Sequence, residues 1–298
     1  MWCDHPGRDA GDLVSSNEEK TLATMSCSKY DMYHRCGYAF FRRYIMGEKS
    51  PPTGALAFGQ ADDVTKHDVY DVKIETGVTE TAASCMDRFA AKFDEVAEDV
   101  EDWKGEDKGK LMDTGVQLIH AWRDECAVPT HPIATQMQFH VPVDYGQRSF
   151  DFMGYVDFVQ KLPDSGANVI TDNKTSGRRW GASKVKDSSQ AVGYGVAAAE
   201  DEELKKLRVN PNDVHFHVAV KSKTPQSQTP ESDPALIRTT DQTEREGFKR
   251  MLARAHINIA ENIESGAWMP NRTNFLCSKR WCGYWRECQA EFGGEIKD

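Results

Sequence analysis

Residues 149–160 read SFDFMGYVDFVQ and residues 167–175 read ANVITDNKT, joined by the turn LPDSGAN. Both stretches are short and rich in β-branched and aromatic residues, which is typical of strands bounded by turn residues. Antiparallel pairing would bring Asp157 and Asp172 to neighbouring positions near one end of a sheet. Lys174 follows two residues later and therefore points to the same face as Asp172.

Two carboxylates and one ammonium that converge in this way suit hydrolysis of a phosphodiester bond. Carboxylate oxygens bind hard divalent cations such as Mg²⁺, which usually takes one or two protein carboxylates alongside substrate phosphate. The lysine could orient or help to deprotonate the attacking water and shield the charge that develops on phosphorus. An Asp-x-Lys tripeptide is nevertheless common and also occurs at ordinary polar strand ends. Other residues near it are needed to distinguish a catalytic site from a polar strand end.

Residues on two predicted helices fall at spacings that could complete such a site. Gln190 and Tyr194 lie four residues apart on the helix that follows the two strands, so they share one helix face. On an earlier helix, Asp63 and His67 are also four residues apart. Asp63 or His67 is therefore the candidate for a third metal ligand.

The other periodic segments surround this small sheet with helices. Predicted helices cover about 28–46, 55–74, 80–101, 107–126, 187–207 and 240–264, and predicted strands cover 136–143, 149–160, 167–175 and 214–221. This order indicates an α/β (α+β) fold with a small mixed central sheet. His215 and His217 alternate with apolar residues on the last strand, for which solvent exposure is the simplest explanation.

The predicted domain organisation is a short leader followed by one domain. Residues 1–23 show no packing pattern and are expected to be disordered. The single domain over 24–298 would comprise a helical part (24–130), the catalytic sheet core (131–222) and a helix with a cysteine cluster (239–298).

Charge is distributed unevenly along a chain whose net charge is −10. That net charge argues against indiscriminate nucleic-acid binding, because phosphate contacts need local positive charge. Residues 87–107 are strongly acidic and could receive a protein partner, whereas residues 172–186 are basic. Arg178 and Arg179 are candidate phosphate contacts, and Trp180 beside them could stack on an unpaired base.

Three of the eight cysteines lie in FLCSKRWCGYWREC, residues 275–288, as Cys277, Cys282 and Cys288. Eight cysteines are too few for a disulfide-stapled scaffold of this size, and clustered thiols in a reducing compartment more often bind metal. Four thiolates can hold either a [4Fe–4S] cluster or zinc.

The residues that could carry chemistry resemble the PD-(D/E)XK nuclease superfamily, specifically its RecB-like branch. The resemblance lies in Gly59 with Asp63 or His67, in G-Y-V-D ending at Asp157, in D-N-K at 172–174, and in Q-x-x-x-Y at 190–194. It implies a restriction-endonuclease-like sheet in which Asp157 and Asp172 bind Mg²⁺ or Mn²⁺ and Lys174 is catalytic. Gln190 and Tyr194 would position DNA or the lysine. The family commonly has histidine four residues after the glycine, where this chain has Asp63.

The same resemblance suggests the fourth cysteine. Iron–sulfur members of the branch, which include the CRISPR adaptation nucleases and the nuclease half of AddB, take one cysteine from a helix before the core and three from a C-terminal cluster. It therefore implies a [4Fe–4S] cluster on Cys36, Cys277, Cys282 and Cys288, with zinc as the alternative, tying the N- and C-terminal segments together. The spacing here is C-x4-C-x5-C, whereas C-x2-C-x5-C is expected.

The expected function is that of a metal-dependent deoxyribonuclease, an exonuclease acting on DNA ends or single strands. The alternative is a non-catalytic DNA-end-binding or partner-binding protein on the same scaffold, with a zinc or iron–sulfur knot. No apolar run is long enough to span a bilayer, and the first twenty residues do not resemble a signal peptide. A cytoplasmic location is expected, in the host cytoplasm if the protein is phage-encoded.

Overall fold

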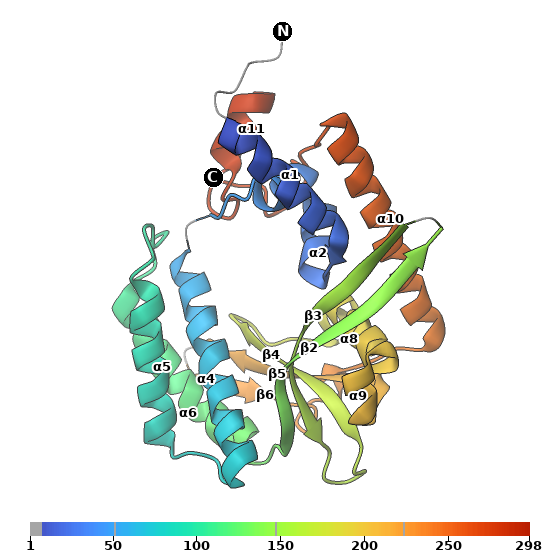
Figure 1. Cartoon of the computed structure of the whole chain (residues 1–298). Helices are drawn as coiled ribbons and strands as arrows, with labels where there is room; N and C mark the ends of the chain where they lie inside the picture. The colour runs from blue at the N-terminus through green and yellow to red at the C-terminus, as the bar shows by residue number, and fades with distance from the viewer. Residues whose placement is uncertain (1–7, 51, 147, 223) are drawn as a thin grey trace. The chain divides into compact units, whose positions relative to one another are not determined.

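Strand β3 (Arg148–Lys161) and strand β4 (Asn168–Ser176) form the antiparallel pair on which the site depends, as shown in the computed structural model (Figure 1). Their register places Phe158 opposite Thr171 and Lys161 opposite Asn168. The structure describes residues 8–298 except 51, 147 and 223. The predicted strand pair is confirmed.

Strand β5 (Val209–Val220) runs parallel to β4, with Asp172 opposite Phe216 and Asn173 opposite His217. The other strands are β1 (Thr24–Met25), β2 (Pro132–Tyr145), β6 (Gln226–Gln228) and β7 (Ile237–Thr239). Among the described residues they make one mixed sheet of order β1-β3-β4-β5-β6, in which β2 also pairs with β3 and β7 with β5. This confirms the predicted mixed central sheet flanked by helices.

The chain divides into two compact units built from separate stretches of sequence. The terminal unit comprises the described residues of Met1–Ser50, Pro142–Met153 and Gly247–Asp298, and the sheet unit comprises those of Pro51–Val141 and Gly154–Glu246. Sequence analysis predicted a single domain over 24–298. Strands β2 and β3 pass from one unit into the other, so no linker or change of composition marks the boundary in the sequence.

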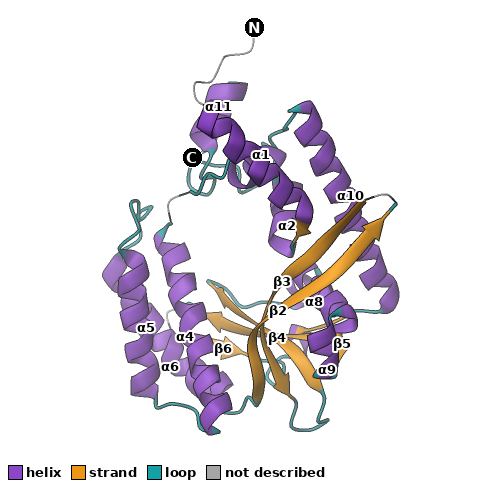
Figure 2. Cartoon of the chain, in the orientation of Figure 1, coloured by secondary structure: helices purple, strands orange, loops and turns teal. Residues whose placement is uncertain are grey.

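Helices cover both faces of the strands in the sheet unit. Their bounds are α4 (Gly54–Thr76), α5 (Ala82–Ala97), α6 (Lys108–Trp122) with a π-helical turn at Arg123–Ala127, α7 (Ala182–Lys186), α8 (Ser189–Glu200) and α9 (Glu202–Lys206). Figure 2 shows α4, α5 and α6 on one side of the strands and α8 and α9 on the other. Thr53 and Ser188 cap α4 and α8 through side-chain oxygens that accept backbone N–H groups.

Aromatic side chains form the core between α4, α5, α6 and the sheet. The fully buried members include Phe58, Tyr70, Phe89, Phe93, Trp122 and Phe158. Tyr70 of α4 packs on Phe158 of β3 with ring centroids 4.5 Å apart. Gly115 lets α6 approach α5 closely, because a Cβ there would lie 2.0 Å from Cζ of Phe89. This core fixes α4 against the sheet.

The terminal unit is mainly helical. Its elements include α1 (Arg8–Ala23), α2 (Cys27–Arg35), α3 (Gly37–Phe40), a π-helical turn at Phe41–Ile45, most of α10 (Gln242–Ser265), and α11 (Trp285–Phe292). Residues 8–23 were expected to be disordered, but they form α1, and Thr21 of that helix is buried. The rest of the predicted leader, residues 1–7, lies outside the described residues.

The first predicted helix differs from the structure at two points. It begins at Cys27 and not at residue 28, and its N-cap is Ser26, whose hydroxyl accepts the N–H of Lys29. The helix is also interrupted at Cys36, whose backbone is extended, with φ −165° and ψ 111°. The periodic aromatic pattern conceals this break, since α3 resumes at once and keeps Tyr38 and Phe40 buried.

The expectation of solvent-exposed His215 and His217 is wrong. Both are buried, at 4% and 2% exposure, on the face of β5 that packs near Phe158, whose ring lies 5.7 Å from that of His217. Burial lowers the pKa of both histidines, that of His217 to about 3. Alternation with apolar residues failed as a signal here because helices cover both faces of the sheet.

The described part of the chain has no helix that is both long and apolar enough to cross a membrane.

Candidate functional site

The candidate site begins where the pairing of β3 and β4 ends. One step beyond the Phe158–Thr171 pair, the two strands carry Asp157 and Asp172. The Asp157 carboxylate accepts a hydrogen bond from the backbone N–H of Asn173 at 2.8 Å. This side chain therefore takes the place of a backbone partner and is held at the end of the strand pair.

Lys174 lies at the centre of a chain of polar contacts. Its ammonium is 2.6 Å from Oδ2 of the fully buried Asp172 and donates to the amide oxygen of Gln190 at 2.9 Å. The Gln190 amide nitrogen donates to the Tyr194 hydroxyl at 2.7 Å. That hydroxyl lies 3.0 Å from the carbonyl oxygen of Tyr155 and 3.3 Å from Oδ1 of Asp172. The structure thus brings together the four predicted residues Asp172, Lys174, Gln190 and Tyr194.

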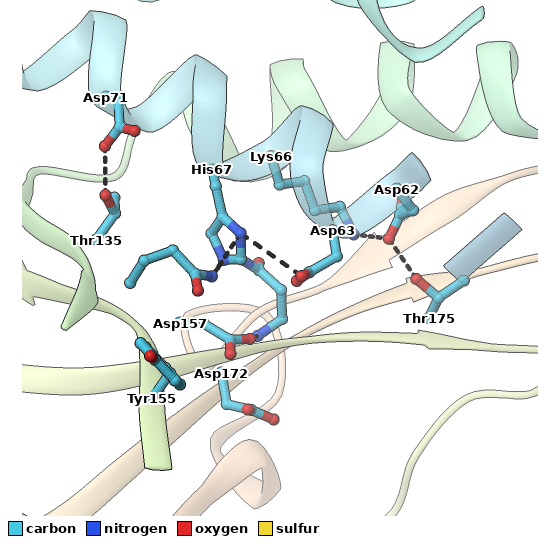
Figure 3. A network of polar contacts seen from close by, with 12 residues as sticks. Asp62, Asp63, Lys66, His67, Asp71, Thr135, Tyr155, Asp157, Asp172 and Thr175 are labelled. Atoms are coloured by element: carbon cyan, nitrogen blue, oxygen red, sulfur yellow. Dashed lines mark hydrogen bonds and ion pairs between the residues drawn. The ribbon is translucent and has the colours of Figure 1, made fainter. Parts of the chain in front are cut away.

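Helix α4 adds two further side chains from the other side of the strand end. Asp63 and His67 point from α4 towards Asp157 of β3 (Figure 3). One ligand atom from each of these three residues lies within 4.8 Å of the other two, and Asp63 Oδ2 is 3.6 Å from His67 Nδ1. The sequence left Asp63 and His67 as alternatives, whereas the structure brings both to the same place.

The electrostatics of this group favour a bound cation. Burial, and then the neighbouring Asp172, raise the pKa of Asp157 well above its usual value. Burial also raises the pKa of Asp63 and lowers the pKa of His67, and each of these two partly opposes the shift of the other. A divalent cation would stabilise the carboxylates in their charged form and the imidazole in its neutral form.

The donor set fits Mg²⁺ or Mn²⁺. Two carboxylates suit either ion, and an imidazole nitrogen is a ligand that Mn²⁺ accepts more readily than the harder Mg²⁺. Asp63 is half exposed, with 50% of its side chain accessible, which leaves room for water and a phosphate oxygen. Asp172, the fourth predicted ligand, is engaged by Lys174 in this structure.

Burial acts to lower the pKa of Lys174, but the carboxylates of Asp172 and Asp157 outweigh it and raise the pKa above the usual value. Lys174 is therefore a cation at neutral pH. In this arrangement the ammonium is suited to stabilising negative charge on a phosphate, more than to accepting a proton from water.

Sequence reasoning missed several residues around the group. The amide nitrogen of Gln136 lies 2.6 Å from Nδ1 of His67. The backbone φ of Gln136 is 47°, a positive value that is uncommon for residues other than glycine. Tyr155 lies two residues before Asp157 and is 53% exposed. No sequence signal distinguishes Gln136, because its role depends on a local backbone conformation.

The predicted DNA contacts differ in their environments. Arg178 and Arg179 are exposed, and Arg179 donates to the side chain of Gln226 at 3.1 Å. Trp180 is only partly exposed: its ring packs on Phe216 with centroids 5.3 Å apart. The acidic residues within 87–107 are mostly exposed. Contacts of these segments with DNA or with a protein remain predictions.

The four predicted cysteine ligands meet in the terminal unit. Cys36 lies at the break between α2 and α3, and Cys277, Cys282 and Cys288 come from the segment leading into α11 and from α11 itself. All four line one cavity of about 170 Å³. Burial raises the pKa of Cys282, and the other three thiols add to that shift, which marks them as its neighbours.

Hydrogen-bond donors lie near two of these thiols. The backbone N–H of Asn271 points to Sγ of Cys36 at 3.4 Å, and Nη2 of Arg272 lies 3.8 Å from Sγ of Cys288. Such donors stabilise thiolate, the form that binds metal. The cavity is more than ten times the volume that admits a single water, about 10–15 Å³. The four thiols that line it can hold either a [4Fe–4S] cluster or a zinc ion.

Comparison with known proteins places the chain in a family. No curated protein matches the chain. One solved structure, described as "Crystal structure of SSO0001", is similar over 96% of this chain and 98% of its own, with 10% identity and a TM-score of 0.38, a likeness that carries no argument. A model of the PD-(D/E)XK nuclease superfamily matches residues 24–289, and the helix-flanked mixed sheet is consistent with a restriction-endonuclease-like fold. Because that match spans most of the chain, the protein belongs to the PD-(D/E)XK nuclease superfamily.

Proposed function

We propose that the protein is a Mg²⁺- or Mn²⁺-dependent deoxyribonuclease of the RecB-like branch that degrades DNA from ends or in single strands. The observation that carries the proposal is the position of Lys174. Its ammonium is held between Asp172 and Gln190 beside the cluster of Asp63, His67 and Asp157. A protein that only bound DNA would have no need to keep the carboxylates of Asp63, Asp157 and Asp172 together beside a phosphate, where they repel the ligand.

In the proposed reaction, the oxygen of a water attacks phosphorus and gives up a proton to solvent. The bond from phosphorus to one bridging oxygen breaks, and that oxygen takes a proton from solvent as it leaves. Asp63, His67 and Asp157 would hold the divalent cation, which supplies positive charge to the phosphate and makes a nearby water more acidic. Lys174 stays protonated and stabilises the negative charge that builds up on the non-bridging oxygens.

Gln190 and Tyr194 hold the side chains of Lys174 and Asp172 in position. Gln190 accepts from the ammonium and donates to Tyr194, whose hydroxyl lies close to the carbonyl of Tyr155 and to Asp172. The lysine is therefore oriented before DNA arrives, and little reorganisation is needed during the reaction. The exposed ring of Tyr155 and the exposed guanidinium groups of Arg178 and Arg179 support contacts with a nucleic-acid strand.

A substrate comparison tests this proposal. A single-stranded DNA labelled at its 5′ or 3′ end would be offered as a linear oligonucleotide and as a closed circle, with Mn²⁺ or Mg²⁺. We expect the linear strand to be degraded and the circle to survive, and Asp172→Ala to abolish cleavage. Cleavage of the circle at the same rate would show that the protein is an endonuclease and not an exonuclease. Binding without any cleavage would favour the non-catalytic DNA-end-binding alternative.

We also propose that Cys36, Cys277, Cys282 and Cys288 hold a [4Fe–4S] cluster with a structural role. The support is the shared cavity, its volume, and the donors directed at two of the sulfurs. Such a cluster would join the N-terminal helices to the C-terminal segment across more than two hundred residues of chain. Tyr38 and Tyr284 already join these segments, through hydrogen bonds of 2.8 Å to Glu291 and to the carbonyl of Glu48.

Anaerobic purification followed by an ultraviolet–visible spectrum and metal and sulfide analysis tests the cluster. We expect a broad brown absorbance with about four irons and four sulfides per chain. One zinc per chain without sulfide would establish the zinc alternative.

A further inference from the structure

A second set of charged side chains lies beside the proposed metal site (Figure 3). Asp62 and Lys66 are one turn apart on α4, and both are buried, with 3% and 0% of their surfaces exposed. Their charged groups are 2.6 Å apart, and the Lys66 ammonium also lies 5.7 Å from the centre of the Trp122 ring. Neither residue belongs to the polar chain around Lys174.

This pair is bonded to the catalytic strand. The Thr175 hydroxyl of β4 donates to Oδ2 of Asp62, the same oxygen that receives Lys66 (Figure 3). Asp62 is the residue before Asp63, and Thr175 is the residue after Lys174. One short contact therefore joins the helix half of the site to the strand half, one residue away from each.

A second side-chain contact anchors the C-terminal half of α4 to β2. Asp71 accepts a hydrogen bond from the Thr135 hydroxyl of β2, as Figure 3 also shows. Lys73 donates to three backbone carbonyl groups between Ala127 and Thr130, at 2.6–2.8 Å. Asp63 and His67 lie between these attachments, so the rotation of α4 about its axis is set on both sides of them.

Stability alone gives a poor reason for the buried pair. Replacing a buried ion pair by well-packed apolar side chains is often neutral or stabilising, because removing two charges from water is costly. The Trp122 ring beside the Lys66 ammonium would equally pack against an apolar side chain. In addition, Oδ1 of Asp62 has no hydrogen-bond partner among the described residues. Buried charges and unsatisfied polar atoms of this kind occur mainly where function requires a defined geometry.

We propose that Asp62, Lys66 and Thr175 are positioning residues that hold Asp63 and His67 at metal-binding distance from Asp157. Lys66 fixes the Asp62 carboxylate, and that carboxylate fixes β4 through Thr175. This inference rests on the proposed metal site, and metal affinity tests it separately from DNA cleavage.

The test compares Mn²⁺ affinity, measured by titration calorimetry and by the electron paramagnetic resonance signal of free Mn²⁺, across matched variants. Thr175→Val keeps the shape of the side chain and removes only the hydroxyl. We expect its Mn²⁺ affinity to fall about 10–100-fold, the usual effect of removing a group that orients a metal ligand. Thr175→Ser restores the hydroxyl and should restore the affinity. Thr76→Val, at an exposed hydroxyl of α4 that bonds only to nearby backbone, should bind Mn²⁺ as the wild type does.

The paired variant Asp62→Leu with Lys66→Met covers the case in which Thr175→Val fails to fold. It removes both charges together, so no unpaired charge is left inside, and we expect a folded protein with the same loss of Mn²⁺ affinity. Wild-type affinity in Thr175→Val or in the paired variant would overturn the inference. If the wild type binds Mn²⁺ and cuts no DNA, the nuclease proposal fails, while an affinity loss in these variants would still support positioning.

Discussion

Acidification from pH 7 to pH 5 should destabilise the protein through His217. This side chain is 2% exposed, and burial lowers its pKa from 6.5 to about 3, with further contributions from His215 and Lys66. In the unfolded chain, His217 therefore becomes protonated below about pH 6.5, whereas in the folded chain it becomes protonated only near pH 3. Stability is complete above the unfolded pKa and is lost as the pH falls through this window.

The magnitude follows from the two pKa values. Each pH unit below the unfolded pKa costs about 1.36 kcal/mol, so the His217 contribution to the free energy of unfolding falls by about 2 kcal/mol between pH 7 and pH 5. The result depends little on the folded value, provided that it lies well below 5.

Urea unfolding of the wild type and His217→Gln at both pH values measures this term. Glutamine does not titrate, so the variant should lose about 2 kcal/mol less than the wild type over the same interval. His131→Gln, at an exposed histidine, should lose as much as the wild type. Equal pH dependence in the wild type and His217→Gln would show that His217 is solvated or already charged in the folded state, which contradicts the packing of β5 described above.

Three further changes have defined outcomes. Lys174→Met should lower the rate of DNA cleavage about 10²–10³-fold, because the charge beside the phosphate is lost. Wild-type turnover of this variant in a steady-state assay with Mn²⁺ would show that Lys174 takes no part in the reaction. Cys282→Ser should lose iron and unfold at lower temperature, as followed by iron analysis and circular dichroism, and a stable, iron-replete variant would exclude Cys282 as a ligand. Gly115→Ala should cost about 1–3 kcal/mol of stability by overpacking against Phe89, and urea unfolding with no change would show that α5 and α6 can move apart freely.

Local spacing predicted which strand and helix residues of the proposed site lie together. Asp157, Asp172 and Lys174 lie on two strands joined by a short turn, and Gln190 and Tyr194 are one turn apart on one helix, so neighbouring positions follow from strand and helix geometry. The choice between Asp63 and His67 could not be made in this way. Both face the site, because α4 crosses the strand end at a point that only tertiary packing determines.

Other features depend on contacts that spacing does not show. His217 looked like a surface residue because its strand alternates, yet α4 and its neighbours cover that face. The Asp62–Thr175 contact joins residues 113 positions apart, and neither residue stands out in the sequence. The break at Cys36 lies inside a continuous aromatic pattern, since α3 restarts with the same face buried.

The most direct test of the proposed active site is the cleavage of linear single-stranded DNA by Asp157→Asn, with Mn²⁺ binding measured in the same preparation. Asparagine keeps the size of the side chain and removes the charge that lies between Asp63, His67 and Lys174. The proposed site predicts a folded variant that binds Mn²⁺ weakly and does not cut DNA, beside a wild type whose cleavage needs the metal and stops with a chelator. Cleavage by Asp157→Asn at the wild-type rate, or wild-type cleavage that persists in chelator, would contradict it.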